Sequence, residues 1–190
     1  WKVEVFPNAI VEGKQLQRIT RVAGPSRTAI FAGRLVPLKG LILALRAMKH
    51  LPQWRLLICG SGPDEKRLRK AAHRYGVSDR VHFLGWVPRG EVMRLMREEA
   101  DVLLFPSFHD EAGLAVAEAV ACGLPAVCIA RGGPPLLGAT AVHAVAPEAT
   151  AEALAAAVLE VADTRPGPSA HGLNHRERLG EILSERGIAS

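Results

Sequence analysis

The stretch SFHDEAGLAVAEAVACGLP, residues 107 to 125, combines an acidic pair, a glycine and a later carboxylate within an otherwise apolar helical run. The pair is Asp110 and Glu111, and the single later carboxylate is Glu118. A carboxylate buried on an apolar helix is costly without a partner, so Glu118 needs one. The ribose diol of a bound nucleotide is one candidate partner, and a lysine or a backbone amide is the alternative.

The spacing of this stretch suits a nucleotide. Glu118 lies five residues after Gly113, roughly 7 to 8 Å along a helix at 1.5 Å per residue. We expect the helix to begin near Ala112 and to direct its first N–H groups at a phosphate, which Gly113 allows to come close. Two roles stay open for Asp110, because an Asp just before a helix is also a favoured N-cap.

A second group of candidate residues lies in GRLVPLKG, residues 33 to 40. Arg34 directly follows Gly33, and Lys39 stands at the start of the next helical stretch. Two cations and helical N–H groups facing one crevice suit a diphosphate. Each residue alone is weak evidence, because arginine and lysine are common in surface loops.

The turn CGSGP, residues 59 to 63, offers Gly60 and Gly62 as further positions where backbone can approach a ligand. The third glycine of a dinucleotide fingerprint would stand at position 65, which is Glu65. This departure disfavours a nicotinamide-type site. We predict no cofactor and no metal site, since no Asp-x-Asp occurs and the three cysteines lack zinc or redox spacing. Buried thiols are the simpler interpretation of the cysteines.

The elements that would position these residues form one repeating pattern, in which short apolar runs ending in Gly or Pro alternate with helical stretches. The runs are TAIFAG, RLLICG, VHFLG, DVLLFP, PAVCIA and, more weakly, AVHAVAP. Continuously apolar strands separated by helices indicate a parallel sheet covered on both faces. The predicted fold class is α/β, with a doubly wound, mostly parallel, Rossmann-like sheet. Ligands of such sheets bind beyond the carboxyl ends of the strands.

The composition of the chain limits the number of domains and the cellular location that we expect. A chain of 190 residues that is 48% hydrophobic suits one globular domain. No apolar run reaches the roughly 18 residues that span a bilayer, and no signal peptide opens the chain, so we expect a cytoplasmic protein.

The net charge of +5 could attract nucleic acid, but the basic run EKRLRKAAHR, residues 65 to 74, lacks interleaved aromatics. We interpret that run as a solvated helix face and expect no nucleic-acid partner.

Five ordered blocks resemble a known family. FAGRLVPLKG, LLICGSGP, VHFLGWVP, DVLLFPSFHDEAGLAVAEAVACGLPAV and RGGPPLLG are similar to the C-terminal, donor-binding half of family-four retaining glycosyltransferases of the GT-B fold. The resemblance implies a lead-in from an absent N-terminal domain at residues 1 to 27. It further implies a nucleotide-sugar-binding domain at 28 to 163, then a linker and C-terminal helix at 164 to 190.

The resemblance also implies roles. Arg34 and Lys39 would bind the donor diphosphate and act in catalysis, together with the N–H groups around Gly113 and Leu114. Glu118 would hold the ribose, and backbone near Val87 would meet the base.

Asp110 stands where the family usually has a sugar-contacting glutamate, eight positions before Glu118. Glu111 stands where glycine is common, and Ala112 where an aromatic residue is common. Whether Asp110 or Glu111 contacts the donor sugar stays open.

The implied activity is transfer with retention from a nucleoside-diphosphate sugar, without a metal ion. The acceptor would be bound mainly by the absent N-terminal domain, so this chain alone would bind donor without turnover. Contact of the full-length protein with the inner face of the membrane also stays open. A non-catalytic nucleotide-sugar-binding module and a sugar-nucleotide epimerase of similar fold are the alternatives.

Overall fold

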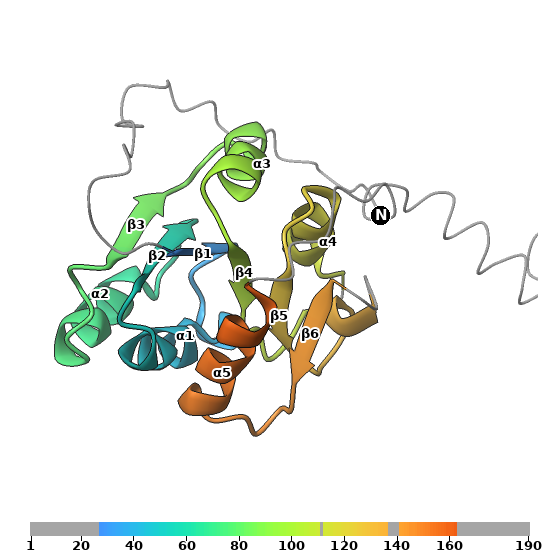
Figure 1. The fold of residues 1–190 in the computed structure, drawn as a ribbon. Helices are drawn as coiled ribbons and strands as arrows, with labels where there is room; N and C mark the ends of the chain where they lie inside the picture. Colours follow the sequence, from blue (N-terminus) through green and yellow to red (C-terminus); the bar gives the residue numbers. More distant parts are fainter. Residues whose placement is uncertain (1–26, 111, 137–140, 163–190) are drawn as a thin grey trace, which may run out of the picture.

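The computed structural model describes residues 27–110, 112–136 and 141–162. They form a six-stranded sheet of order β3-β2-β1-β4-β5-β6 in which every pairing is parallel (Figure 1). The strands are β1 (Arg27–Ala32), β2 (Trp54–Cys59), β3 (Val81–Gly85), β4 (Val102–Phe105), β5 (Ala126–Ile129) and β6 (Val142–Val145). The predicted fold class is confirmed. Each predicted strand agrees with the structure to within two residues at either end.

Helices cover both faces of the sheet. They are α1 (Leu41–Ala47), α2 (Glu65–Arg74), α3 (Arg89–Glu98), α4 (Leu114–Ala121) and α5 (Ala151–Val161), with 3-10 turns η1 (Pro37–Lys39), η2 (Met48–His50) and η3 (Pro134–Leu136). Helix α1 packs against α2 and α5, whereas α3 packs against α4 (Figure 1). Helices α1, α2 and α5 therefore cover one face of the sheet, and α3 and α4 cover the other (Figure 1).

The core lies along the central strands, where hydrophobic residues are buried on both faces because both faces carry helices. Phe31 of β1 and Phe105 of β4 stack with ring centroids 5.9 Å apart and planes 15° apart. All three cysteines are buried, as expected. Burial raises the pKa of Cys59 and of Cys128 to about 12, so neither thiol ionises near neutral pH.

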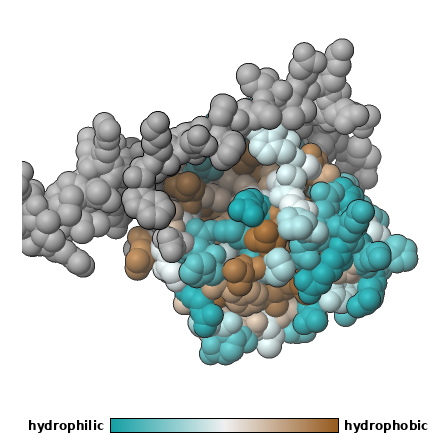
Figure 2. Space-filling model, turned by 180° about the vertical axis from the view of Figure 1, so that it is seen from behind, coloured by the Kyte–Doolittle hydropathy of each residue, from teal (hydrophilic) through white to brown (hydrophobic). Residues whose placement is uncertain are grey.

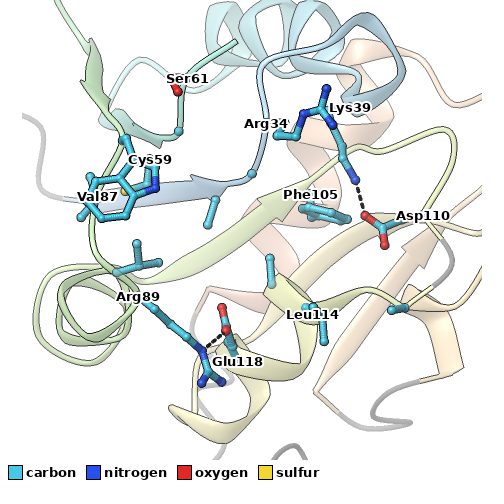
Figure 3. Close-up of a pocket in the computed structure, with 17 residues that line it drawn as sticks. Arg34, Lys39, Cys59, Ser61, Val87, Arg89, Phe105, Asp110, Leu114 and Glu118 are labelled. Atoms are coloured by element: carbon cyan, nitrogen blue, oxygen red, sulfur yellow. Dashed lines mark hydrogen bonds and ion pairs between the residues drawn. The ribbon is translucent and has the colours of Figure 1, made fainter. Parts of the chain in front are cut away.

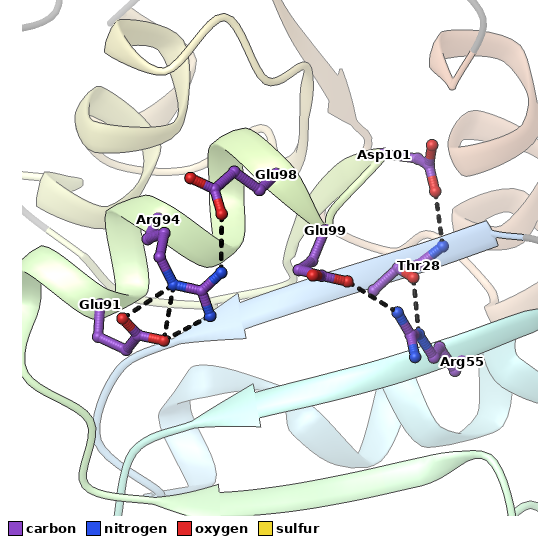
Figure 4. Close-up of polar contacts among 7 residues, drawn as sticks. All are labelled: Thr28, Arg55, Glu91, Arg94, Glu98, Glu99 and Asp101. Carbon is purple, nitrogen blue, oxygen red and sulfur yellow. Dashed lines mark hydrogen bonds and ion pairs between the residues drawn. The ribbon is translucent and has the colours of Figure 1, made fainter. Parts of the chain in front are cut away.

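Polar contacts hold the amino ends of the central strands together (Figure 4). The backbone N–H of Thr28 donates to Asp101 Oδ2 at 2.7 Å, which ties β1 to the loop before β4. The Nε of Arg55 donates to Thr28 Oγ1 at 2.8 Å, and the same guanidinium lies 3.4 Å from Glu99. This network lies at the strand ends opposite to those that carry the predicted site.

The surface of the described residues has separate hydrophilic and apolar areas. The view from behind shows a broad hydrophilic area on one side and apolar residues gathered toward the lower middle (Figure 2). None of the helices in the described ranges combines the length and the apolar character needed to cross a bilayer.

Residues 1–26 and 163–190 lie outside the described residues, and with them most of the predicted lead-in and all of the predicted linker and C-terminal helix. The proposed boundaries between these parts stay predictions.

Candidate functional site

A cavity of about 460 Å³ opens at the carboxyl ends of β1 to β4 and against the start of α4 (Figure 3). The strand order reverses between β1 and β4, and the crevice at such a reversal is where doubly wound sheets bind ligands. Its volume lies in the range of small-molecule sites, about 300 to 1,000 Å³. The topology therefore places the cavity where the sequence predicted a ligand.

One end of the cavity is cationic. Arg34 follows β1 and is exposed, and Lys39 ends η1 with its side chain 20% exposed. The Lys39 ammonium forms an ion pair with Asp110 Oδ2 and lies 5.3 Å from the centroid of the Phe105 ring. An ammonium has three donors, so this contact leaves others for a ligand.

Asp110 is held from two sides. Its Oδ1 accepts a hydrogen bond from the backbone N–H of Gly113 at 2.8 Å, while its Oδ2 contacts Lys39. Burial by itself would raise the pKa of Asp110, but Lys39 and the N–H groups of Gly113 and Ala112 outweigh it and lower that pKa. The carboxyl group is therefore ionised at neutral pH.

Helix α4 begins two residues later than predicted, at Leu114 instead of near Ala112. Gly113 is its N-cap, with a φ of 59° in the left-handed region that favours glycine. The N–H of Gly113, just before the helix, is occupied by Asp110 Oδ1. The first helical bonds run from Val116 and Ala117 to the Gly113 carbonyl, so the N–H of Leu114 precedes them at the cavity wall.

Glu118 lies toward the other end of the cavity, away from Arg34 and Lys39 (Figure 3). Its side chain is 17% exposed, and its Oε1 accepts a hydrogen bond from Arg89 Nε at 2.5 Å. The partner is thus an arginine from the start of α3, a residue that the sequence reasoning did not consider. Arg89 is 69% exposed, and Glu118 Oε2 has no hydrogen-bond partner among the described residues.

The glycines of the strand-end turns differ in position. Gly33 and Gly60 line the cavity and lie so close that a Cβ on Gly60 would be 1.9 Å from the Gly33 carbonyl oxygen. Gly62 does not line the cavity. A Cβ there would lie 2.4 Å from the carbonyl oxygen of Leu35, so this glycine serves the packing of one turn on the other.

The end of β3 supplies a further wall, with Val87 as predicted and Trp86 and Arg89 beside it. Trp86 is 41% exposed, which is unusual for an aromatic side chain of this size. Ser61, after β2, also lines the cavity and was not predicted. Arg89 could not be singled out from the sequence, because it lies four residues after Gly85 and only the packing of α3 beside α4 brings it to Glu118.

The structure thus brings together most of the predicted residues in one cavity. They are Gly33, Arg34, Lys39, Gly60, Val87, Asp110, Leu114 and Glu118. Gly62 and Gly113 do not line the cavity, and Glu111 lies outside the described residues. Among the residues described, no three His, Cys, Asp or Glu side chains gather in a way that could hold a metal ion.

A doubly wound parallel sheet with a cavity at its switch point is the architecture of the Rossmann-like folds. The chain belongs to the glycosyl transferases group 1 family, whose model matches residues 14–183. It is 38% identical over 120 residues to D-inositol 3-phosphate glycosyltransferase of Mycobacterium sp. (strain KMS), which covers 59% of this chain and 27% of the relative. The same enzyme of Mycolicibacterium gilvum is 35% identical over 140 residues, or 68% of this chain and 31% of the relative. The chain spans about a third or less of these relatives.

Solved structures show the same fold. Sucrose-phosphate synthase from Thermosynechococcus elongatus matches with a TM-score of 0.67 and 27% identity, over 86% of this chain and 46% of that one. Anabaena HepE in complex with UDP and glucose matches with a TM-score of 0.66 and 22% identity, over 84% and 48%. The C-terminal domain of the group 1 glycosyltransferase LpcC from Francisella tularensis matches at 0.64 and 15% identity, over 88% and 89%. The fold is that of the GT-B glycosyltransferases.

Proposed function

We propose that this chain is the donor-binding half of a glycosyltransferase that transfers a sugar from a nucleoside-diphosphate sugar to an acceptor with retention and without a metal ion. The proposal rests on one observation, the separation of positive and negative side chains at the two ends of one cavity. Arg34 and Lys39 lie at one end, and the half-buried carboxylate of Glu118 lies at the other. A diphosphate needs cationic partners, and a ribose of the same nucleotide needs hydrogen-bond acceptors such as a carboxylate.

The proposed chemistry is stabilisation of the departing diphosphate. Arg34, Lys39 and the N–H of Leu114 would oppose the negative charge that grows on the leaving oxygen, which is the role of preorganised donors in transfer reactions. Asp110 would orient Lys39 and contact the donor sugar. That HepE was solved with UDP and glucose supports a donor of this class.

Glu118 would accept hydrogen bonds from the ribose hydroxyls through Oε2, while Arg89 keeps Oε1 occupied. This arrangement supports the ribose role, because the carboxylate is held in place and still has an oxygen for a diol. The acceptor site is proposed to lie in the remainder of a longer protein. A cytoplasmic location, with contact to the inner face of the membrane, stays a prediction.

The full-length protein tests the proposal. Incubation with candidate nucleotide sugars and acceptors, followed by product analysis, should show transfer with the anomeric configuration retained and unaffected by a chelator. Donor interconversion or hydrolysis without acceptor would indicate an epimerase, and donor binding without any product would indicate a binding module. Loss of transfer on removing divalent metal would refute the metal-free mechanism.

Variants of the acidic pair test the sugar contact. Asp110→Asn should depress transfer and leave binding of the sugar-free nucleoside diphosphate nearly unchanged. If Asp110→Asn is silent and Glu111→Gln abolishes transfer, the sugar contact belongs to Glu111.

A further inference from the structure

A second hollow, of about 580 Å³, lies between α1 and α2. These helices lie side by side on the sheet face opposite α3 and α4 (Figure 1). The hollow shares no lining residue with the cavity at the strand ends. Its walls carry Arg46 from α1 and the side chains of Lys66, Arg67, Lys70 and Arg74 from α2.

Three of these cations form one stripe. Lys66, Lys70 and Arg74 recur every four residues, so they stand on one side of the helix about 6 Å apart. All three are exposed, and none has an acidic partner in the described part of the chain. Like charges four residues apart destabilise a helix. The stripe therefore leaves a local repulsion that a bound anion would relieve.

The acids of this region are occupied elsewhere. Glu65 contacts Arg69 at 2.8 Å, and Asp64 contacts Arg67 at 3.3 Å. Arg67 lines the hollow and is paired, whereas Lys66, Lys70 and Arg74 have no acidic partner in the described part of the chain. The positive charge of these three residues is therefore uncompensated.

Arg46 completes the hollow from the facing helix. Its Nε donates to Tyr75 Oη at 3.1 Å, and its guanidinium carbon lies 5.8 Å from the centroid of the Tyr75 ring. This contact orients the planar fork, whose other N–H groups can bind phosphate oxygens. Single-stranded nucleic acid would need free aromatic faces for its bases. Among the described residues that line the hollow, Tyr75 is the one aromatic residue, and it already contacts Arg46 and is partly buried against the core.

We propose that the α1–α2 hollow is a second anion site, which binds a phosphate group through Arg46, Lys66, Lys70 and Arg74. A phosphate carries up to two negative charges and several acceptor oxygens, which suits convergent cations better than a single carboxylate does. The phosphate could belong to a soluble compound or to a lipid headgroup, and the two sources are separable by experiment. The site is independent of the proposed donor cavity.

The test follows backbone amide signals of the isotope-labelled chain during titration with inorganic pyrophosphate. Signals from α2 should shift separately from those at the start of α4, which report on the donor cavity. Lys70→Gln should weaken the α2 response about tenfold or more, the loss expected for one charge-assisted hydrogen bond. Lys49→Gln is the matched control, because Lys49 is exposed on η2, outside the hollow, and the change in net charge is the same.

A second arm uses sedimentation with vesicles of phosphatidylcholine, with and without phosphatidylglycerol. Binding to the anionic vesicles that Lys70→Gln abolishes and Lys49→Gln spares would identify a lipid phosphate as the ligand. A pyrophosphate response without vesicle binding would identify a soluble phosphate. The proposal fails if neither probe affects α2 or if Lys49→Gln weakens binding as much as Lys70→Gln. It also fails if only an acidic peptide such as polyglutamate shifts the α2 signals.

Discussion

Replacing Lys39 by methionine removes the charge that faces Asp110 while keeping most of the side-chain volume. The two side chains are 20% and 15% exposed, so their pair lies between the surface and the interior. Surface pairs contribute about 0 to 1 kcal/mol, and breaking a buried pair costs about 3 to 5 kcal/mol. Asp110 would keep its hydrogen bond from Gly113. We therefore expect Lys39→Met to lower the free energy of unfolding by about 1 to 2 kcal/mol.

The loss should depend on pH. The folded state lowers the pKa of Asp110, so the stabilisation is present above the unfolded pKa of about 4 and disappears as the pH falls through the folded value. The difference between wild type and Lys39→Met should thus be largest near neutral pH and shrink in acid. Urea unfolding at a series of pH values measures it, and the corresponding fall in melting temperature is about 2 to 8 °C.

Lys49→Met is the control for this experiment, because Lys49 is exposed and outside the cavity. It should change the free energy of unfolding by less than about 0.5 kcal/mol. Equal losses for Lys39→Met and Lys49→Met, or a Lys39→Met loss that does not change with pH, would refute the view that this ion pair holds the loop before α4.

Other substitutions probe the walls of the cavity and the core. Gly60→Ala should destabilise the chain by at least about 2 kcal/mol in urea unfolding, since its Cβ would meet backbone 1.9 Å away, whereas Gly90→Ala on open helix surface should not destabilise it. Arg89→Gln should cost no more than about 1 kcal/mol in the same assay, because Arg89 is 69% exposed; a larger loss would mean that its carboxylate partner is effectively buried. Cys59 and Cys128 should resist iodoacetamide at pH 8 until the chain unfolds, because both are buried with a pKa raised to about 12, and rapid labelling seen by mass spectrometry would contradict this.

The strands of the sheet could be predicted because the pattern that indicates each strand lies within a few consecutive residues. Runs such as LLICG are apolar throughout, and this pattern is typical of a strand buried on both faces. Gly or Pro at the end of all these runs except PAVCIA marks the edge where ligands bind. The cations Arg34 and Lys39 could be found for the same reason, since their turn directly follows the first strand.

What could not be predicted depends on contacts between distant segments. Glu118 pairs with Arg89 across 29 residues of sequence, and only the packing of α3 beside α4 brings the two together. The start of α4 at Leu114 likewise could not be predicted, since Gly113 adopts a left-handed φ there and donates its N–H to Asp110. Gly60 and Gly62 have the same sequence signal, yet only the three-dimensional course of two turns places Gly60 at the cavity and Gly62 against Leu35.

The most direct test of the account is calorimetric titration of this chain with a panel of nucleoside diphosphates and the matching nucleosides. We predict that the preferred diphosphate binds without divalent metal. Arg34→Ala should weaken it about tenfold or more while nucleoside binding changes little. Glu118→Gln should weaken both ligands, because both contain the ribose. If Arg34→Ala reduces the binding of nucleoside and diphosphate equally, or Glu118→Gln leaves both unchanged, the nucleotide does not lie in this cavity as proposed.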